Sequence, residues 1–190
     1  ALSLIHDGSV AVGVLGCPNL GLQHPSEAPG AGTLLSASIG AGSAMRPIGG
    51  GDEALISVDA IDDPASARFC ESVEAAHAAH SHQARIAAAL GITRDPVRID
   101  SQCKYAIVAR GDASIYLRLP RDPSYREKVW DHAAGALVIE EAGGRVTDLE
   151  GHPLDFSRGK HLAPSRGIVA TNGHLHDRVL SACREVIALG

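Results

Sequence analysis

The chain has 190 residues, of which 45% are hydrophobic, 21% are charged and 3% are aromatic. This composition excludes wholesale disorder, and a chain of this length can bury a core without a disulfide framework. The formal net charge is -5 and no basic block stands out, which argues against a general nucleic-acid-binding surface. No apolar run approaches the roughly 20 residues of a membrane span.

The chain begins Ala-Leu-Ser-Leu-Ile, without an initiating Met and without the basic and long apolar segments of a signal peptide. This start indicates a processed or truncated chain. The four cysteines, Cys17, Cys70, Cys103 and Cys183, show no C-x-x-C spacing. That distribution favours reduced, buried thiols in a cytosol-like compartment, so a cytoplasmic location is expected.

The first part of the chain favours strands. Apolar runs at 2–5 and 10–15 flank Asp7-Gly8, and Gly supplies the positive φ of a tight turn, so a β-hairpin is predicted. Residues 17–32 are rich in Pro and Gly, which predicts a loop before a strand at 33–39.

Short strands and helices alternate in the rest of the chain, which predicts an α/β sheet covered by helices. The predicted strands are 55–58, 97–99, 115–119 and 168–170. The predicted helices are 64–73, 81–90, 103–109, 131–142 and 174–189. The glycine triplet at 49–51 is the expected boundary between two units, residues 1–53 and residues 54–190.

The segment 130–144 reads W-D-H-A-A-G-A-L-V-I-E-E-A-G-G and carries the most information. Asp131 is predicted to be the N-cap of a helix that Gly143 ends, with Ala-Ala-Gly close behind it. Small residues let a backbone or a ligand come close, and a helix N-terminus favours anions. Asp131 can therefore hold a cation that bridges to a phosphate. Spacing alone favours the plainer alternative, an N-cap Asp on a closely packed helix.

Two further groups have side chains suited to phosphate. Ser101 precedes a predicted helix and Lys104 follows one turn later, so both can contact an anion. The plainer alternative is a Ser N-cap with a solvated Lys. Arg118 lies in a predicted strand on the face opposite its leucine neighbours, where its fork suits a bidentate phosphate contact. The plainer alternative is a salt bridge at the rim.

Three histidines, His77, His80 and His82, invite a metal interpretation. No H-E-x-x-H pattern or Cys partner accompanies them, so a single His that contacts a ligand is favoured over zinc. Local motifs assemble no Ser/His/Asp triad, and G-x-S-x-G, Walker A and G-x-G-x-x-G patterns are absent from the sequence.

These pieces, in this order, resemble the lithium-sensitive, magnesium-dependent phosphomonoesterase superfamily, which includes inositol monophosphatase and fructose-1,6-bisphosphatase. The W-D-x-A-A-G…E-A-G-G…D signature is matched by 130–135, 141–144 and Asp148. Other segments are similar to the 3'(2'),5'-bisphosphate nucleotidase branch. They are V-L-G-C-P-N-L (14–20), D-S-Q-C-K-Y (100–105), Y-L-R-L-P (116–120), S-Y-R-E-K-V-W-D-H-A-A-G (124–135) and P-L-D-F (153–156).

The resemblance implies an αβαβα layered sugar-phosphatase fold. Residues 1–53 would supply the last strands of an N-terminal α+β metal-binding domain, and 54–190 a C-terminal α/β substrate-binding domain. The implied reaction removes the 3'-phosphate of 3'-phosphoadenosine 5'-phosphate and leaves AMP and phosphate. 3'-Phosphoadenylyl sulfate is a further implied substrate, and two or three Mg²⁺ ions are the implied cofactors.

The resemblance also carries roles to single residues. Asp131 matches the last metal-ligand Asp, which lies near the reacting phosphate and sugar, so catalytic, substrate-binding and metal roles are expected for it. Ser101, Lys104 and Arg118 match positions that bind the nucleotide and its 5'-phosphate side. His77 best matches a His near the nucleotide, and His80 is the alternative.

The sequence departs from the family in lacking the metal motif Asp-Pro-Ile-Asp-Gly-Thr and an upstream helix Glu. It therefore resembles the C-terminal half of such an enzyme. The expected partner is the N-terminal half, as a second chain or a lost segment. Three alternatives stay open: an inositol polyphosphate 1-phosphatase-like enzyme, a non-catalytic nucleotide-binding fragment, and a structural remnant.

Overall fold

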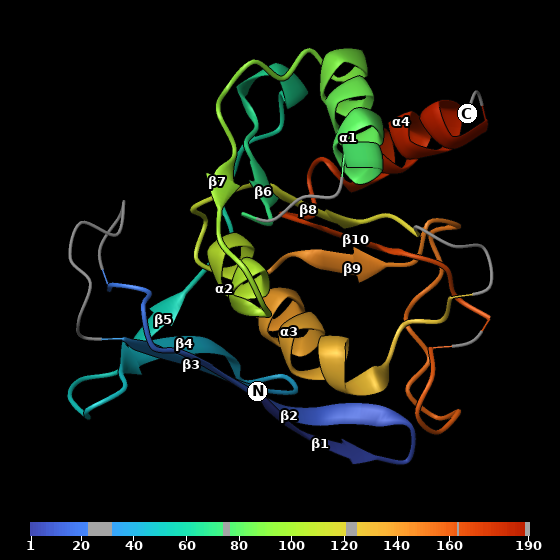
Figure 1. The fold of residues 1–190 in the computed structure, drawn as a ribbon. Helices are drawn as coiled ribbons and strands as arrows, with labels where there is room; N and C mark the ends of the chain where they lie inside the picture. Colours follow the sequence, from blue (N-terminus) through green and yellow to red (C-terminus); the bar gives the residue numbers. More distant parts are fainter. Residues whose placement is uncertain (23–31, 74–76, 121–124, 163, 189–190) are drawn as a thin grey trace.

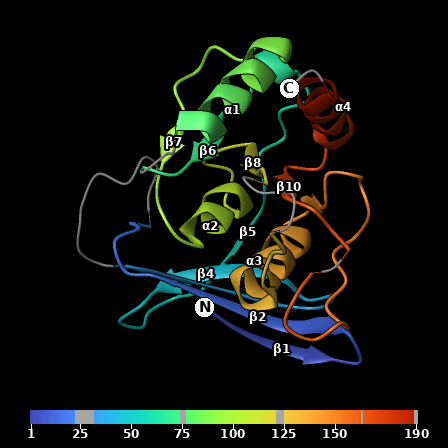
Figure 2. The ribbon, with the colours of Figure 1, turned by 45° about the vertical axis from the view of Figure 1, so that its right-hand side comes forward.

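The computed structural model describes residues 1–22, 32–73, 77–120, 125–162 and 164–188, with the side chains of 77–81 left out. The elements stack in four layers: a first sheet, helices α2 and α3, a second sheet, and helices α1 and α4 (Figure 1). A turned view shows α2 and α3 between the sheets and α1 with α4 outside the second sheet (Figure 2). The mixed α/β architecture predicted from the sequence is confirmed.

The first sheet is an antiparallel meander whose strands follow chain order. Its strands are β1 (Leu2–His6), β2 (Ser9–Cys17), β3 (Thr33–Ser38), β4 (Gly42–Pro47) and β5 (Ala54–Ile56). The predicted hairpin is confirmed, because Asp7 and Gly8 both adopt positive φ, 49° and 77°, as a tight two-residue turn requires. The predicted strand at 33–39 is β3, but the sequence interpretation missed β4.

The inner face of the first sheet packs on α3. Side chains alternate along each strand, so Leu15 and Leu35, which are cross-strand partners, both point inward and are fully buried. Gly13 lies on the same face, where a Cβ would stand 2.7 Å from the carbonyl oxygen of Ala134. Glycine at this strand position therefore lets the helix lie directly on the sheet.

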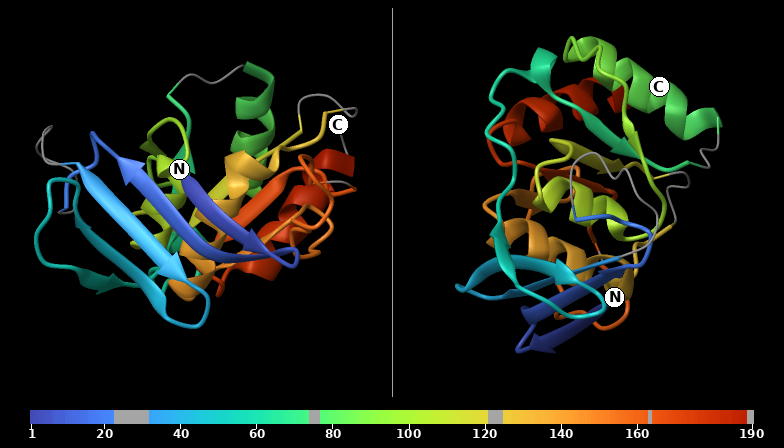
Figure 3. Two further views of the ribbon diagram at one scale, coloured as in Figure 1. Left: turned by 90° about the horizontal axis from the view of Figure 1, so that it is seen from below. Right: turned by 90° about the vertical axis from the view of Figure 1, so that its left-hand side faces the viewer.

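No described element covers the outer face of the first sheet (Figure 3, left). By register its side chains include Leu2, Leu4, Val12, Val14 and Leu34. Leu2 is 69% exposed and Leu4 is 57% exposed. Exposed apolar side chains that gather on one face are typical of an interface.

The second sheet is mixed, with strand order β7-β6-β8-β10-β9. Its strands are β6 (Phe69–Glu71), β7 (Val97–Arg98), β8 (Ile115–Arg118), β9 (Arg145–Thr147) and β10 (Ile168–Thr171). The helices are α1 (His77–Ala89), α2 (Cys103–Ala109), α3 (Val129–Glu141) and α4 (His176–Ala188), with a 3₁₀ turn, η1 (Pro64–Ser66). Cores lie on both faces of this sheet, so Ile168 and Val169, adjacent in β10, are both fully buried in different cores.

Several predicted elements of the second half are confirmed. The strands at 97–99, 115–119 and 168–170 and the helix at 103–109 match β7, β8, β10 and α2. The helices at 81–90 and 174–189 match α1 and α4 with shifted ends. On α4 the predicted apolar face is buried at Val179, Cys183 and Val186, but Ile187 is 38% exposed.

Two predictions about helices were wrong. Residues 64–73 do not form a helix: Asp63 accepts the Ala65 N–H and caps the start of a single 3₁₀ turn, and the backbone is already extended at Ala67. Phe69 then enters a central strand that is buried on both faces. Helix α3 begins at Val129, so Lys128 occupies the N-cap and Asp131 lies inside the first turn. Strand β9 was missed.

The division at residue 53 stays a prediction. Strand β5 begins just after it and pairs with β4 of the first sheet, where Leu55 is opposite Ala44. The four cysteines are free, as predicted, and Cys17, Cys70 and Cys183 are buried. In the part of the chain that the structure describes, no helix has the length and apolarity to cross a bilayer.

Candidate active site

Helix α3 carries the central candidate residues, and its first turns are fixed by close packing. Ala133 and Ala134 are buried, and a Cβ on Gly135 would overlap the ring of Tyr105 from α2. The Ala-Ala-Gly run therefore serves helix packing against α2 and β2, as the plainer interpretation of the sequence proposes. It leaves Asp131, one turn earlier, at the edge of the packed region.

Asp131 is half-buried, and its carboxylate has no hydrogen bond or ion pair with any residue that the structure describes. It lies in the first turn of α3, where the unpaired N–H groups and the helix dipole favour a negative charge. The carboxylate is therefore available to a cation or a ligand, although it does not cap the helix.

A buried polar network lies directly behind Asp131. The Oε2 atom of Glu127 accepts hydrogen bonds from Arg118 Nε at 2.7 Å and from His132 Nε2 at 3.0 Å. The other ring nitrogen of His132 is 2.7 Å from the Tyr105 hydroxyl. Glu127 and His132 are 3% and 0% exposed, so these two members of the network are shielded from water.

The charges of this network stabilise each other. Burial alone raises the pKa of Glu127, but the hydrogen bond from His132 and the charge of Arg118 outweigh it, so the pKa lies below its usual value. Burial likewise works to lower the pKa of Arg118, and the charge of Glu127 more than offsets this, so the pKa is raised. The Arg118–Glu127 pair is therefore ionised at neutral pH.

Lys104 places a second cation near Arg118. Its side chain is 7% exposed, and Nζ lies 5.6 Å from the centroid of the Tyr116 ring. Burial lowers the pKa of Lys104, and the nearby Arg118 charge acts in the same direction. Tyr116 packs edge-on against Tyr105 with ring centroids 5.2 Å apart, which joins Lys104 to the network around Glu127.

Ser101 lies at the exposed approach to α2, in the left-handed region with φ 64°. Its hydroxyl oxygen accepts the Cys103 N–H at 3.3 Å, which is the local capping contact of the plainer interpretation. Gln102 donates to the carbonyl oxygen of Trp130 at 2.9 Å and so ties the start of α2 to the start of α3. A phosphate contact by Ser101 stays a prediction.

Cys103 places a thiol in the same turn. A hydrogen bond with Cys17 lowers the pKa of Cys103 to about 6, against the effect of burial, with Ser101 acting in the same direction as Cys17. Cys17 is buried at the end of β2, so this contact also joins α2 to the first sheet.

His77 begins α1, but its side chain and that of His80 lie outside the described part of the chain. Their expected contact with a nucleotide stays a prediction. The structure brings Arg118 and Asp131 together around Glu127 and places Lys104 over the Tyr116 ring. It places Ser101 at the start of α2 and leaves the two histidines undetermined.

Within the described residues, Glu127, Asp131 and His132 form the one group of three potential metal ligands, with ligand atoms within 4.8 Å of one another. Glu127 is a poor Mg²⁺ ligand because Arg118 and His132 already engage its Oε2 atom, and His132 is a poor one because Mg²⁺ prefers oxygen to imidazole nitrogen. Asp131 fits as a single oxygen ligand. Mg²⁺ requires about six ligands, so this group alone does not complete a site.

Sequence reasoning missed the roles of Glu127, His132 and Tyr105. A signal was present, because an acid four residues before Asp131 and a histidine directly after it bring three titratable groups to one helix start. Their pairing with Arg118 and Tyr105 depends on tertiary contacts and could not be inferred from spacing.

The rest of the signature supports the fold. The Glu141 carboxylate accepts the N–H groups of Gly40 and Gly42, each at 2.8 Å, and so holds the β3–β4 turn. Asp148 is 3% exposed and accepts the His152 N–H at 2.8 Å inside a surface loop. Neither carboxylate lies in the group around Asp131.

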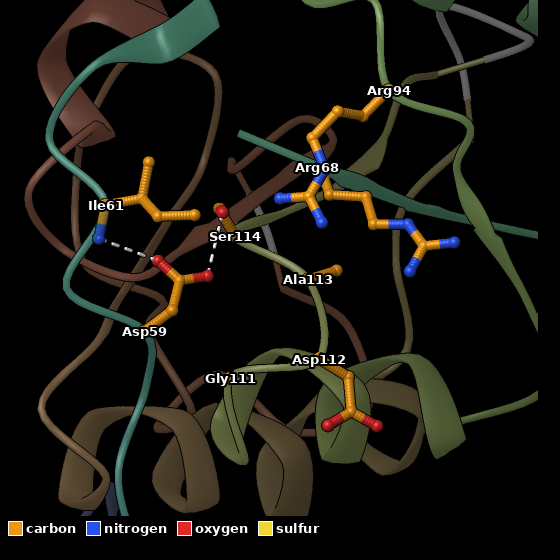
Figure 4. Close-up of a pocket in the computed structure, with 8 residues that line it drawn as sticks. All are labelled: Asp59, Ile61, Arg68, Arg94, Gly111, Asp112, Ala113 and Ser114. Atoms are coloured by element: carbon orange, nitrogen blue, oxygen red, sulfur yellow. Dashed lines mark hydrogen bonds between the residues drawn. The ribbon is translucent and has the colours of Figure 1, made fainter. Parts of the chain in front are cut away.

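A pocket of about 290 Å³ lies at the other end of β8 and is lined by Asp59, Arg68, Arg94 and Ser114 among others (Figure 4). Asp59 is committed there, since it accepts hydrogen bonds from Ser114 Oγ at 2.8 Å and from the Asn172 amide at 2.6 Å. It ties the segment after β5 to the second sheet and does not take part in the site around Asp131.

The fold is that of a layered α/β protein in which the Asp131 carboxylate, at the start of α3, has no partner among the described residues. The model of the inositol monophosphatase family matches residues 1–188, so the chain belongs to the inositol monophosphatase family.

Curated relatives narrow the comparison. The chain is 48% identical to a 3'(2'),5'-bisphosphate nucleotidase of Emericella nidulans, and the match covers 99% of this chain and 57% of the relative. It is 47% identical to a protein of the same name from Oryza sativa, covering 98% of this chain and 54% of the relative. The chain thus spans about half the length of the curated relatives it matches.

Solved structures share the fold. The inositol monophosphatase of Thermotoga maritima matches with a TM-score of 0.68 at 22% identity, covering 98% of this chain and 60% of that one. SuhB of Mycobacterium tuberculosis matches with a TM-score of 0.65 at 23% identity, covering 99% and 64%. The predicted membership of a layered sugar-phosphatase fold is confirmed.

Proposed function

We propose that this chain is the nucleotide-binding part of a magnesium-dependent 3'(2'),5'-bisphosphate nucleotidase. The reaction is hydrolysis of the 3'-phosphate of 3'-phosphoadenosine 5'-phosphate. Water forms a bond to the 3'-phosphorus, the bond to the sugar oxygen breaks, and that oxygen gains a proton, which leaves AMP and inorganic phosphate. 3'-Phosphoadenylyl sulfate is a second substrate under this proposal.

The uncommitted Asp131 carboxylate beside the cations Arg118 and Lys104 carries this proposal. A substrate with two phosphates presents one to the metal-bearing side and another to fixed cations. We assign Arg118, Lys104 and Ser101 to the 5'-phosphate side of the nucleotide and His77 to the nucleoside. The identity of nearly half to proteins named 3'(2'),5'-bisphosphate nucleotidase supports this choice of substrate.

We assign one Mg²⁺ ligand to this chain, Asp131, and the remaining ligands to the N-terminal part of the enzyme. When bound, Mg²⁺ supplies an activated water and stabilises the leaving oxygen. Asp131 also lies near the reacting phosphate and sugar in this proposal. The helix dipole at the start of α3 supports the binding of both the metal-bridged phosphate and its product.

We propose that an N-terminal half, as a second chain or as a preceding segment, covers the outer face of the first sheet. The exposed Leu2 and Leu4 and the apolar side chains beside them support a protein partner on this face. The same half would carry the Asp-Pro-Ile-Asp-Gly-Thr motif that this sequence lacks. The cytoplasmic location belongs to this proposal and is supported by the four free thiols.

Complementation tests the proposal. We expect the chain, co-expressed with an N-terminal half from a related nucleotidase, to release phosphate from the adenosine bisphosphate in the presence of Mg²⁺. Each half alone is expected to be inactive. A well-folded complex with an intact metal motif that stays inactive contradicts the proposal.

Substrate choice needs a separate measurement. We expect the completed enzyme to hydrolyse 3'-phosphoadenosine 5'-phosphate in clear preference to inositol 1,4-bisphosphate. The reverse preference would make the protein an inositol polyphosphate 1-phosphatase. Binding of the adenosine bisphosphate without metal, combined with an absence of turnover in the complex, would identify a nucleotide-binding module instead.

A further inference from the structure

Glu127 has a buried carboxylate for which the family resemblance provides no role. Its side chain is 4% exposed and lies just before α3, four residues ahead of Asp131. Burying a carboxylate is costly unless it is paired and hydrogen-bonded, and here Oε2 receives both Arg118 and His132. A buried charge of this kind fixes the orientation of the group that it pairs with.

The Tyr116 and Tyr125 side chains hydrogen-bond to Arg118, and Glu127 pairs with one edge of its guanidinium group. The contact is made by Nε at 2.7 Å, while the Arg118 side chain remains 38% exposed. A guanidinium group is planar and rigid, so a fixed Nε edge sets the direction of the two terminal nitrogens. The 38% exposure of the side chain leaves part of the guanidinium group accessible to a phosphate.

Hydrogen bonds through His132 also fix the position of Glu127. His132 lies between Glu127 and Tyr105: its Nε2 atom is 3.0 Å from Glu127 Oε2, and its Nδ1 atom is 2.7 Å from the Tyr105 hydroxyl oxygen. Tyr105 is fixed in turn, because its ring packs against Gly135 with no room for a methyl group. The orientation of Arg118 thus depends on a chain of contacts that runs into the interface between α2 and α3.

We propose that Glu127 is a positioning residue that aims Arg118 at the non-reacting phosphate of the substrate, with His132 and Tyr105 holding Glu127 in place. This inference rests on the proposed nucleotidase function and deepens it, since it makes Glu127 a determinant of bisphosphate specificity. The reacting phosphate does not contact Glu127 in this arrangement. Glu127 therefore acts on substrate binding through Arg118 and has little effect on turnover.

The test compares two nucleotides in the complete enzyme assembled as above. Adenosine 3',5'-bisphosphate carries the second phosphate and adenosine 3'-monophosphate lacks it. We would measure kcat and KM of both for the wild type, Glu127→Gln, Arg118→Ala and the double variant. Asp177→Asn is the matched control, because it removes a carboxylate from an exposed arginine pair, Arg145–Asp177, at 3.0 Å.

We expect Glu127→Gln to raise KM for the bisphosphate about tenfold, with kcat changed less than about twofold and the monophosphate unaffected. The double variant should match Arg118→Ala, because Glu127 acts only through that side chain. Asp177→Asn should behave as wild type. Equal losses on both nucleotides, or additive losses in the double variant, would show a merely structural ion pair and overturn the inference.

The outcomes also separate this inference from the proposal beneath it. A wild-type enzyme without preference for the bisphosphate overturns the nucleotidase proposal and this inference together. A wild-type preference that Glu127→Gln leaves unchanged overturns the inference alone. If Glu127→Gln does not fold, Tyr105→Phe replaces it as the test variant. This change removes only the hydroxyl group that contacts His132, and it should raise KM for the bisphosphate about twofold to threefold.

Discussion

The two ends of helix α3 carry acids of opposite character. At its start, Asp131 has no partner among the described residues, and the Arg118–Glu127 ion pair lies close to it, with the Glu127 side chain buried. At its end, Glu141 accepts two backbone N–H groups and holds the β3–β4 turn. Both acids belong to one sequence signature, so a single motif contains a group available for chemistry and a group consumed by the fold.

Buried histidines near the two ends of α3 also differ in the groups that surround them. His132, near the start, bridges a carboxylate and a tyrosine hydroxyl. His176, beyond the C-terminal end, lies between two hydroxyl groups, Thr147 Oγ1 at 2.9 Å and Thr171 Oγ1 at 3.0 Å. The start of α3 thus gathers interacting charged groups, whereas His176, beyond its end, is buried between two neutral hydroxyl groups. Substitutions at either end should separate turnover from stability.

The largest effect is expected for Asp131→Asn. Loss of the charge removes the proposed metal ligand, so kcat of the completed enzyme should fall about a thousandfold. The free energy of unfolding should change by less than about 0.5 kcal/mol, because the carboxylate makes no contact to lose. Initial rates with Mg²⁺ and urea unfolding check the two parts, and unchanged turnover would remove Asp131 from the site.

The next effect concerns the packing that sets the start of α3. Gly135→Ala should lower the free energy of unfolding by about 3 kcal/mol, because the new methyl group overlaps the Tyr105 ring and the helix must shift. Gly16→Ala is the control, since nothing lies within 4 Å of that Cβ position. Urea unfolding of both variants gives the comparison. Equal stability would show that α2 and α3 repack without cost.

The pH dependence of stability tests the environment of His176, beyond the end of α3. Burial, helped by the Arg145 charge, lowers the pKa of His176 from 6.5 to about 4. The unfolded chain therefore takes up the proton first as the pH falls, so stability present at neutral pH is lost between about 6.5 and 4. Between pH 7 and pH 5 this loss should be about 2 kcal/mol.

His176→Gln supplies the comparison for that slope. Glutamine can still bond one or both threonine hydroxyls but does not titrate, so the variant should lack the His176 share of the pH dependence. Unfolding free energies at pH 5 and pH 7 for both proteins isolate it, since the other titrating groups are shared. Parallel pH profiles would contradict the lowered pKa.

The sequence predicted features whose causes are local. Asp7-Gly8 forms the turn of the first hairpin because its conformational preference is contained in two residues. Strand β6 was missed because three residues buried on both faces show no alternation to separate them from a helix. Asp131 was recognised from its motif, but its place in the first turn was not, because Lys128 gives no capping signal.

The partners of the candidate site were beyond the sequence. Arg118 was singled out as a phosphate-binding residue, and the rim salt bridge was its alternative. The structure has an ion pair with Glu127 and leaves part of Arg118 exposed, so the two interpretations are compatible. The spacing of Glu127 from Asp131 marked it among the 22 acids, but its pairing with Arg118 depends on tertiary contact and could not be read from the sequence.

The smallest effect is expected for Glu141→Gln, which makes the same carboxylate-to-amide change as Asp131→Asn at the opposite end of α3. The amide keeps one acceptor for the Gly40 or Gly42 N–H and turns a donor toward the other, so one charge-assisted hydrogen bond is lost at a part-exposed site. The free energy of unfolding should fall by about 1 kcal/mol. Turnover per folded molecule should equal wild type, because the turn is at the far end of α3 from Asp131. Loss of turnover without loss of stability would mean that the end of α3 also belongs to the site, and the division between its two ends would fail.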